Sequence, residues 1–398
     1  MSNTNPSIIH LNDELKLLIA CCQTDPSKDD INYIRSYLDT SAQSNLTSLA
    51  SSHGILPLVY KTIKNLSKND DSYSSTLLSE LKPLYLAIAH RNMLMTSELI
   101  KIIHLLNENN IEALAFKGPT LSQMAYGDIT LRQYSDLDIL VDEENAFEAG
   151  TLMTQNGHTA LLPLNILSNK TCLHTAKDFS LMSETSGAHT ELHWRLFEKK
   201  YNISLLSCPL DKKCQTVKIN NHEIKTLQNE LLLVYLCLHG AKHAFERIEW
   251  ICDIDRLVRS SEIDWVQAIA IAEESHSKRS FYLGLSLAHH HFRTILPSDL
   301  MQGIDADDIR ALQIMTEKQM TKKDNERSDF KRNRDTFFYQ AKLFDKKTDI
   351  IHFYLSTFFN ISTTDCQTFV LPERIKFLYL ILRPIRLATN YTQKIFKK

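Results

Sequence analysis

Two acidic residues two positions apart are the residues of this chain best suited to chemistry. The segment SDLDILV (135–141) alternates Asp136 and Asp138 with apolar residues, as a β-strand does. Side chains at i and i+2 project from the same face of a strand. Adjacent carboxylates repel each other, and a divalent cation relieves that repulsion while binding phosphate oxygens. The pattern predicts a site for Mg²⁺ (or Mn²⁺), although an isolated D-x-D is also common at solvated strand ends.

A third acidic residue has a similar setting. The segment TELHWR (190–195) alternates in character, which predicts a strand with Glu191, His193 and Arg195 on one face. Such a polar stripe is commonly just the solvent-facing side of a sheet. Beside a D-x-D pair, however, Glu191 would either complete a second metal position or accept the proton of an attacking oxygen. The sequence leaves both roles open.

A turn ahead of these strands has the features of an anion site. In the sequence FKGPT, Gly118 separates an expected strand from an expected short helix, with Pro119 at its first position and Gly127 beyond its end. A turn without a side chain leaves backbone N–H groups and the positive end of the helix dipole open to an anion. Lys117 adds a positive charge there. Many such turns bind nothing, so this signal is weak by itself.

The elements that must position these residues predict an α+β protein. Residues 1–110 have helical periodicity, and the run NENN ends the last helix. We expect a catalytic core over residues 111–227, built on a small mixed sheet. Helical periodicity returns over residues 228–320, and residues 321–398 read as a charged linker followed by a basic helical tail.

The expected strands are short and bounded by turn residues. They are IEALAF (111–116), DLDILVD (136–142), KDFSLMS (177–183) and AHTELHWRL (188–196). The segment VKINNHEIKTL (217–227) predicts a hairpin that turns at Asn220 and Asn221.

The composition excludes several classes of protein. The 45 basic and 47 acidic residues give a net charge of −2, which argues against wrapping duplex nucleic acid through bulk positive charge. The nine glycines include no G-x-G or Walker spacing, so the common nucleotide-binding loops are absent. No secretory signal, membrane-length apolar run or C-x-x-C pair is visible. We therefore expect a cytoplasmic protein with reduced cysteines.

Read in order, the turn, the D-x-D strand and the later acidic strand resemble the layout of polymerase-beta-type nucleotidyltransferases. The segments FKGPTLSQMAYGDITLRQYSDLDILV, TELHWRLF and LLLVYLCLHGAKHAFERIEWICDIDRLV resemble the bacterial uncharacterised nucleotidyltransferases of that fold. Flanking segments near both ends are similar as well, so the resemblance covers most of the chain. One departure is Pro119, which stands where the broad superfamily usually has Gly or Ser.

The resemblance implies transfer of a nucleoside monophosphate from a nucleoside triphosphate to an acceptor, with release of pyrophosphate. Asp136, Asp138 and Glu191 would be the catalytic and metal-binding residues, with Mg²⁺ or Mn²⁺ as the cofactor. The implied nucleotide-binding residues are Lys117, Gly118, Thr120, Arg132, Lys242 and His243. The acceptor stays open among a small molecule, a sugar or lipid intermediate, a peptide, a protein and a tRNA.

Two other functions compete with this interpretation. A metal-dependent glycosyltransferase also uses a D-x-D pair, although its nucleotide-binding strands and helices would precede that pair, where this chain is helical. A catalytically silent scaffold or binding protein of the same fold is the second alternative. The presence of all three carboxylates argues against it.

Overall fold

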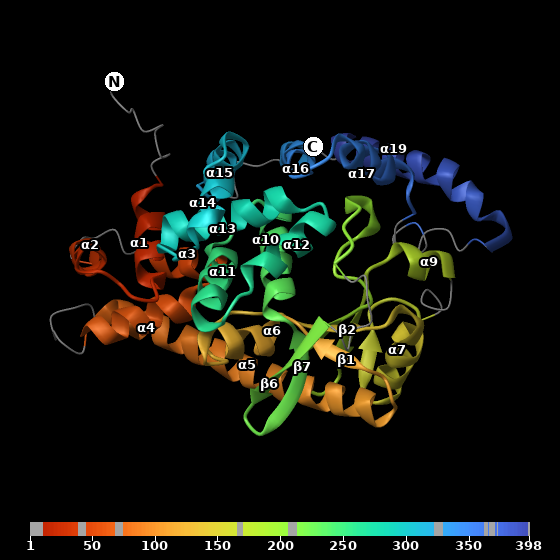
Figure 1. Ribbon diagram of the computed structural model, residues 1–398. Helices are drawn as coiled ribbons and strands as arrows, with labels where there is room; N and C mark the ends of the chain where they lie inside the picture. Colours follow the sequence, from red (N-terminus) through yellow and green to blue (C-terminus); the bar gives the residue numbers. More distant parts are fainter. Residues whose placement is uncertain are drawn as a thin grey trace.

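The computed structural model describes residues 11–38, 45–67, 75–164, 170–205, 213–321, 329–361, 365, 371 and 373–396. Over these ranges, a helical N-terminal part is followed by a mixed sheet and then by a longer helical part (Figure 1). The predicted α+β class, with a small mixed sheet between helical regions, is confirmed. None of the described helices is both long and apolar enough to span a membrane.

A five-stranded sheet carries the acidic residues, in the order β1-β2-β5-β4-β3. The central strands β2 (Asp136–Val141) and β5 (His189–His193) are parallel, and the other neighbours pair antiparallel. The remaining strands are β1 (Ala113–Ala115), β3 (His158–Ala160) and β4 (Asp178–Ser183). The four sequence segments expected as strands all contain one, although β1 and β5 are shorter than expected; β3 was not predicted.

The two faces of the sheet are covered by different helices. Leu137 and Ile139 of β2 are almost fully buried in one apolar cluster, which includes residues of α5 (Ser75–Glu108) and α7 (Ala146–Gln155). Leu140 instead belongs to a second cluster with α10 (Asn229–Lys242). Because side chains alternate along a strand, the carboxylates of β2 project toward the α10 side.

Local sequence signals fix several boundaries. Asn110 has a φ of +58° just after α5 ends, as expected for the run NENN. Gly127 has a φ of +68° at the end of a π-helical turn (Ser122–Tyr126) that continues α6 (Gly118–Leu121). The predicted hairpin is present as β6 (Cys214–Ile219) and β7 (His222–Leu227), and Asn220 at its turn has a φ of +53°.

The N-terminal helices share one hydrophobic core with helices from the second half of the chain. They are α1 (Asp13–Cys22), α2 (Lys28–Leu38), α3 (Leu46–Ser52) and α4 (Leu56–Ser67). Their partners include α11 (Ile248–Ser260) and α13 (Lys278–Phe292). The side-chain amide of Gln23 also donates to the backbone oxygen of His291 over 2.8 Å. The four-part division expected from the sequence stays a prediction.

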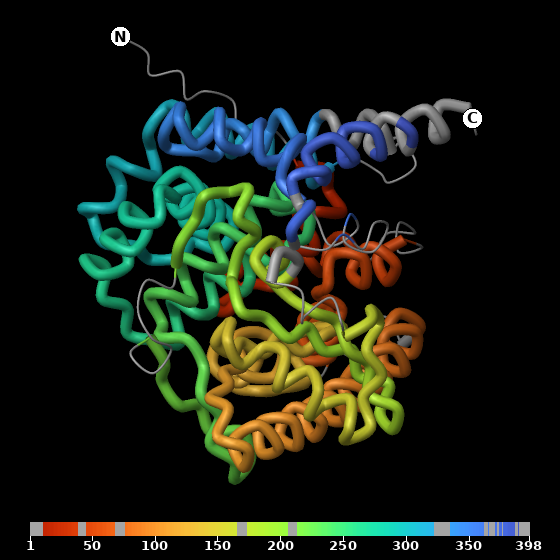
Figure 2. The backbone as a smooth tube through the Cα atoms, turned by 90° about the vertical axis from the view of Figure 1, so that its right-hand side faces the viewer, coloured from red at the N-terminus to blue at the C-terminus, as the bar shows by residue number. Residues whose placement is uncertain are grey.

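In Figure 2, the blue C-terminal helices lie along the top of the molecule and the orange α5 lies along its bottom. The structure describes seven further helices. They are α9 (Lys170–Thr175), α12 (Trp265–Glu274), α14 (Ser298–Ile304), α15 (Asp307–Met320), α16 (Asp329–Lys342), α17 (Lys347–Phe359) and α19 (Tyr379–Phe396). Short 3-10 turns span Glu143–Asn145, Lys199–Tyr201 and Glu373–Leu378.

Candidate active site

The parallel pairing of β2 and β5 brings the three acidic residues together. Asp138 lies opposite Glu191 in the strand register, and Asp136 lies opposite His189. Two groups of potential metal ligands result, one of Asp136, His189 and Glu191, the other of Asp138, Glu191 and His193. Within each group, one ligand atom of every residue lies within 4.8 Å of the others. Glu191 belongs to both groups, so its carboxylate stands between the two aspartates.

Asp138 is the buried member of the pair, with 2% of its surface exposed. The Lys117 ammonium lies 3.1 Å from its Oδ2 atom, and His193 Nε2 lies 3.1 Å from its Oδ1 atom. Burial alone would raise the pKa of Asp138, but these two partners hold it well below its usual range. Burial would likewise lower the pKa of Lys117, and Asp138 instead raises it well above normal. The two groups therefore form a buried ion pair.

Asp136 has the opposite electrostatic setting. It is half-buried, and its pKa is raised by burial and by the negative charge of Asp138. Glu191 has a pKa lowered to about 2, chiefly because it accepts a hydrogen bond from His193. Carboxylates crowded in this way are stabilised by further positive charge, which a divalent cation supplies. The donor set of carboxylate oxygens and imidazole nitrogens fits such an ion.

Two residues at this centre were not assigned a role from sequence. His193 Nε2 also lies 3.2 Å from Glu191 Oε2, so its ring links two carboxylates. Its position two residues after Glu191 was the available signal. Lys177, immediately before β4, contacts Asp178 and lies 3.8 Å from Glu191 Oε2. Nothing local in the sequence marks Lys177, because only strand pairing brings it to Glu191.

A cavity of about 250 Å³ opens beside Asp136 and Asp138. Its lining includes four cationic side chains, Arg91, Lys117, Arg132 and Arg247, together with Glu249, His239 and Trp250. Arg247 donates to Glu249 over 2.6 Å, and its guanidinium lies 5.8 Å from the centre of the Trp250 ring. Burial raises the pKa of Glu249 to about 7. The cavity thus combines positive charge with an aromatic wall next to the carboxylates.

Arg132 lines this cavity, and its side chain is also held by ion pairs with two buried carboxylates. Its guanidinium donates to both Asp253 oxygens, over 2.8 and 2.9 Å, and lies 3.2 Å from Glu249. Asn92 of α5 donates to the backbone oxygens of Ile129 and Arg132 over 2.7 and 2.8 Å. The loop ahead of β2 is therefore anchored from both sides. The contact of Arg132 with phosphate stays a prediction.

At Gly54, between α3 and α4, the N-terminal part of the chain packs directly against Glu249 in the cavity wall. It has a φ of +72°, and an added Cβ atom would lie 1.7 Å from Glu249 Oε2. The backbone oxygen of neighbouring His53 accepts from the Glu249 amide over 3.2 Å. A side chain at position 54 would displace the Arg247–Glu249 pair. Nothing in the sequence near Gly54 indicates this role, since its partners lie almost two hundred positions away.

Four of the residues that the sequence analysis assigned to nucleotide binding contact other parts of the protein in the structure. Gly118 begins α6 with a φ of +55° and is buried against β2. The Thr120 hydroxyl is fully buried and lies within hydrogen-bond distance of the Ala115 and Lys117 backbone oxygens. Lys242 pairs with Glu198 over 2.9 Å, away from the cavity lining, and the His243 ring lies 5.3 Å from that of Trp250. The assignment of these four to nucleotide stays a prediction.

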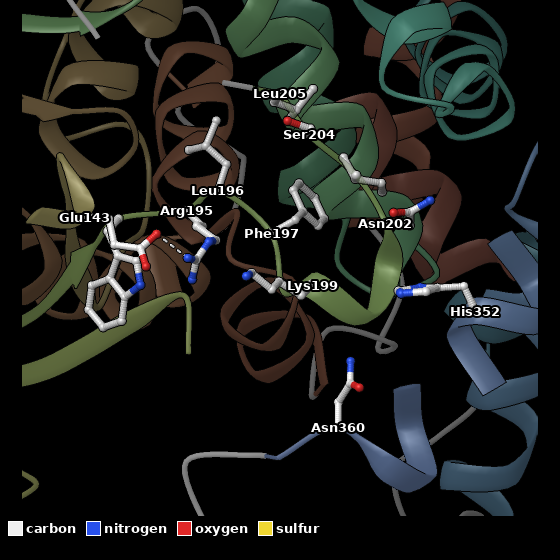
Figure 3. Close-up of a pocket in the computed structure, with 12 residues that line it drawn as sticks. Glu143, Arg195, Leu196, Phe197, Lys199, Asn202, Ser204, Leu205, His352 and Asn360 are labelled. Carbon is white, nitrogen blue, oxygen red and sulfur yellow. Dashed lines mark hydrogen bonds and ion pairs between the residues drawn. The ribbon is translucent and has the colours of Figure 1, made fainter. Parts of the chain in front are cut away.

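A second, larger cavity of about 490 Å³ lies where the chain leaves β5 (Figure 3). Arg195 and Glu143 form an ion pair on one side, and Lys199 and Asn202 follow along the same segment. His352 and Asn360, from α17 and its end, close the opposite side. The backbone oxygen of Lys177 accepts from the amides of Trp194 and Arg195, which links this wall to the carboxylate centre.

Comparisons with known proteins give one family and two solved structures. The sequence profile of the uncharacterised nucleotidyltransferase family matches residues 39–293, a range that contains all three carboxylates and the lining of the smaller cavity. No curated protein sequence matches the chain.

Two solved structures match about half of the chain. The antibiotic-resistance factor ANT(2'')-Ia is 14% identical, with a TM-score of 0.33 over 49% of this chain and 98% of its own. An antigenic nucleotidyltransferase-like protein from Paracoccidioides brasiliensis is 14% identical, with a TM-score of 0.31 over 52% of this chain and 96% of its own.

Proposed function

Because the chain belongs to the uncharacterised nucleotidyltransferase family, we propose that it moves a nucleoside monophosphate from a nucleoside triphosphate to an acceptor oxygen. The acceptor oxygen forms a bond to the α-phosphorus while the bond from that phosphorus to the bridging oxygen of the β-phosphate breaks. Pyrophosphate leaves, and the acceptor proton passes to solvent or to a nearby base. The convergence of three carboxylates beside a cation-lined cavity is the observation that carries this proposal.

Asp136, Asp138 and Glu191 are the residues that would hold Mg²⁺ or Mn²⁺. When bound, such a cation neutralises charge on the phosphates and fixes their orientation. Glu191 would be a ligand to an ion in either position, because it belongs to both groups of potential ligands. Lys117 contacts the Oδ2 atom of Asp138, which keeps this carboxylate ionised and holds it in place.

The smaller cavity suits the nucleoside triphosphate. Its four cationic side chains would offset the negative charge of the polyphosphate, which is the main requirement of phosphoryl transfer. Arg91 is held toward the site by donating to the Tyr134 backbone oxygen over 2.8 Å. Trp250 offers an aromatic surface on which a base can stack.

The larger cavity offers room for the acceptor. Its volume of about 490 Å³ falls in the range of small-molecule sites, and its walls carry charged and amide side chains rather than only apolar ones. Lys177 connects this wall to the carboxylates, because its backbone oxygen accepts from Trp194 and Arg195 and its ammonium lies 3.8 Å from Glu191 Oε2. A polar acceptor with a free hydroxyl group is the class that this lining favours.

The position of a radioactive label tests the reaction type. The protein is incubated with divalent cation, acceptor extracts and nucleoside triphosphates labelled at either the α- or the γ-phosphorus. Nucleotidyl transfer places the α-label on the acceptor and the γ-label in pyrophosphate. Transfer of the γ-label to an acceptor would contradict the proposal, as would turnover of nucleotide sugars alone.

Asp136→Asn provides the matching variant, because it removes a half-buried carboxylate without breaking the Lys117 pair. We expect it to abolish α-label transfer. Glu144→Gln, at an exposed acidic residue just after β2, is the control and should keep full activity. If the unsubstituted protein and Asp136→Asn bind nucleotide equally and neither transfers the label, the silent scaffold is favoured.

A further inference from the structure

The strand β5 presents two histidines beside Glu191, and each faces a different aspartate. His189 belongs to the half-exposed group with Asp136, whereas His193 belongs to the buried group with Asp138. His193 and Asp138 are each only 2% exposed. The two ligand groups therefore differ in solvent access although they share Glu191.

The hydrogen bonding of His193 is incomplete in a protein without a bound ion. Its Nε2 atom faces two carboxylate oxygens, 3.1 Å from Asp138 Oδ1 and 3.2 Å from Glu191 Oε2, but an imidazole nitrogen carries at most one proton. Its Nδ1 atom is buried without a hydrogen-bond partner. Nε2 can therefore donate to only one of the two oxygens at a time, and Nδ1 makes no hydrogen bond in the structure.

A cation bound to Nε2 would contact both carboxylate oxygens at once. The imidazole proton then lies on Nδ1, which faces Asp178 Oδ2 across 3.9 Å. A ligating histidine that directs its other N–H toward a carboxylate is the usual arrangement in metal sites. Lys117 does not compete for this position, because it contacts the Oδ2 atom of Asp138 and the histidine faces Oδ1.

The observed separations also fit a first coordination sphere. Ligand atoms about 2.1 Å from a cation and at right angles to each other are about 3 Å apart. The distances of 3.1 and 3.2 Å from Nε2 to the two oxygens are close to that value. Little movement would be needed to admit an ion between these three atoms.

We propose that His193 Nε2, Asp138 and Glu191 form a buried position for a first-row divalent transition metal such as Mn²⁺. Mg²⁺ prefers oxygen ligands and retains water, whereas imidazole favours transition metals. The half-exposed Asp136 side is left for a cation that arrives with the nucleotide. This assignment rests on the proposed function only for the use of the metal, since binding itself needs neither nucleotide nor acceptor.

Electron spin-echo measurements on the full-length protein test the ligand directly. With Mn²⁺ below one equivalent and no nucleotide, we expect modulation from a directly bound ¹⁴N nucleus. Incorporation of ¹⁵N-histidine should replace that signal, a readout that needs no variant to fold. The absence of nitrogen coupling in the unsubstituted protein would overturn the proposal.

Two variants then identify the histidine. His193→Gln should lose the nitrogen signal and weaken Mn²⁺ binding by calorimetry at least about tenfold, while Mg²⁺ binding changes little. His189→Gln is the matched control and should keep both the signal and the affinity. The reverse pattern, or equal preference for Mn²⁺ and Mg²⁺ in the unsubstituted protein, would refute the assignment. A protein that binds Mn²⁺ in this way but transfers no nucleotide would refute only the proposed function.

Discussion

Asp138 and Glu191 lie directly opposite each other on two parallel strands, and the His193 imidazole spans their carboxylates. Parallel strands cannot be joined by a tight turn, so a long crossover must separate the two residues in sequence. Here the crossover contains α7, β3 and β4. The candidate site is thus made by strand pairing rather than by a contiguous motif.

Glu191→Gln should abolish nucleotidyl transfer while leaving the fold intact. The substitution keeps the shape of the side chain but removes the negative charge shared by the two ligand groups. We expect a rate at least about a hundredfold lower and a melting temperature within a few degrees of the original. Pyrophosphate release and thermal unfolding provide the two measurements. Glu184→Gln, at an exposed position in the turn after β4, should change neither.

Lys117→Met should destabilise the protein, because it leaves the buried Asp138 carboxylate without its ammonium partner. Removing one member of a buried ion pair costs about 3–5 kcal/mol. Denaturant unfolding measures that loss. The double variant Lys117→Met with Asp138→Asn should be more stable than the sum of the single effects predicts, since the unpaired charge is gone. Strict additivity would show that the two side chains do not interact.

Gly54→Ala should damage the nucleotide cavity from outside the sheet. The new methyl group meets the Arg247–Glu249 pair, so we expect weaker triphosphate binding together with a loss of stability of about 1–3 kcal/mol. Gly157→Ala is a matched control, since Gly157 also has a positive φ, of +83°, but has open space around its missing side chain. This control should lose stability through backbone strain alone and bind nucleotide normally. Equal binding defects in both variants would rule out the proposed clash.

Trp250 should report nucleotide binding. Its half-buried ring lines the smaller cavity, so we expect a nucleoside triphosphate to quench part of the tryptophan fluorescence. Trp250→Phe should remove that response. Trp265→Phe, at the start of α12, should retain it. Quenching that survives in Trp250→Phe would place the base elsewhere.

The stability of the protein should fall as the pH drops from about 6.5 to about 4, partly because of His243. Burial, followed by the charge of Lys242, lowers the pKa of this histidine to about 4. A group whose pKa is depressed on folding contributes stability above its unfolded value, near 6.5, and loses it as the pH falls through the folded value. In His243→Phe, the free energy of unfolding should fall by about 2 kcal/mol less over this pH range, a figure reduced for the partial exposure of the ring. Parallel pH profiles of unfolding free energy would contradict this.

Local patterns in the sequence predicted much of the candidate site. The alternation around Asp136 and Asp138 correctly predicted a strand there, and the alternation around Glu191 placed His193 on the same face. The hairpin and the ends of α5 and of the turn at Gly127 followed from residues that tolerate positive φ. These features depend on side-chain periodicity and backbone preference, which act over a few residues.

The tertiary structure decided which distant groups meet. Arg132 pairs with Asp253, Lys242 with Glu198, and Gly54 makes room for Glu249. A charged side chain in a sequence has many potential partners, and its burial and ion pairs depend on how strands align and helices pack. The sequence alone therefore determined the kind of residues at the site. Only the folded chain determined that Asp138, Glu191 and His193 share one buried centre.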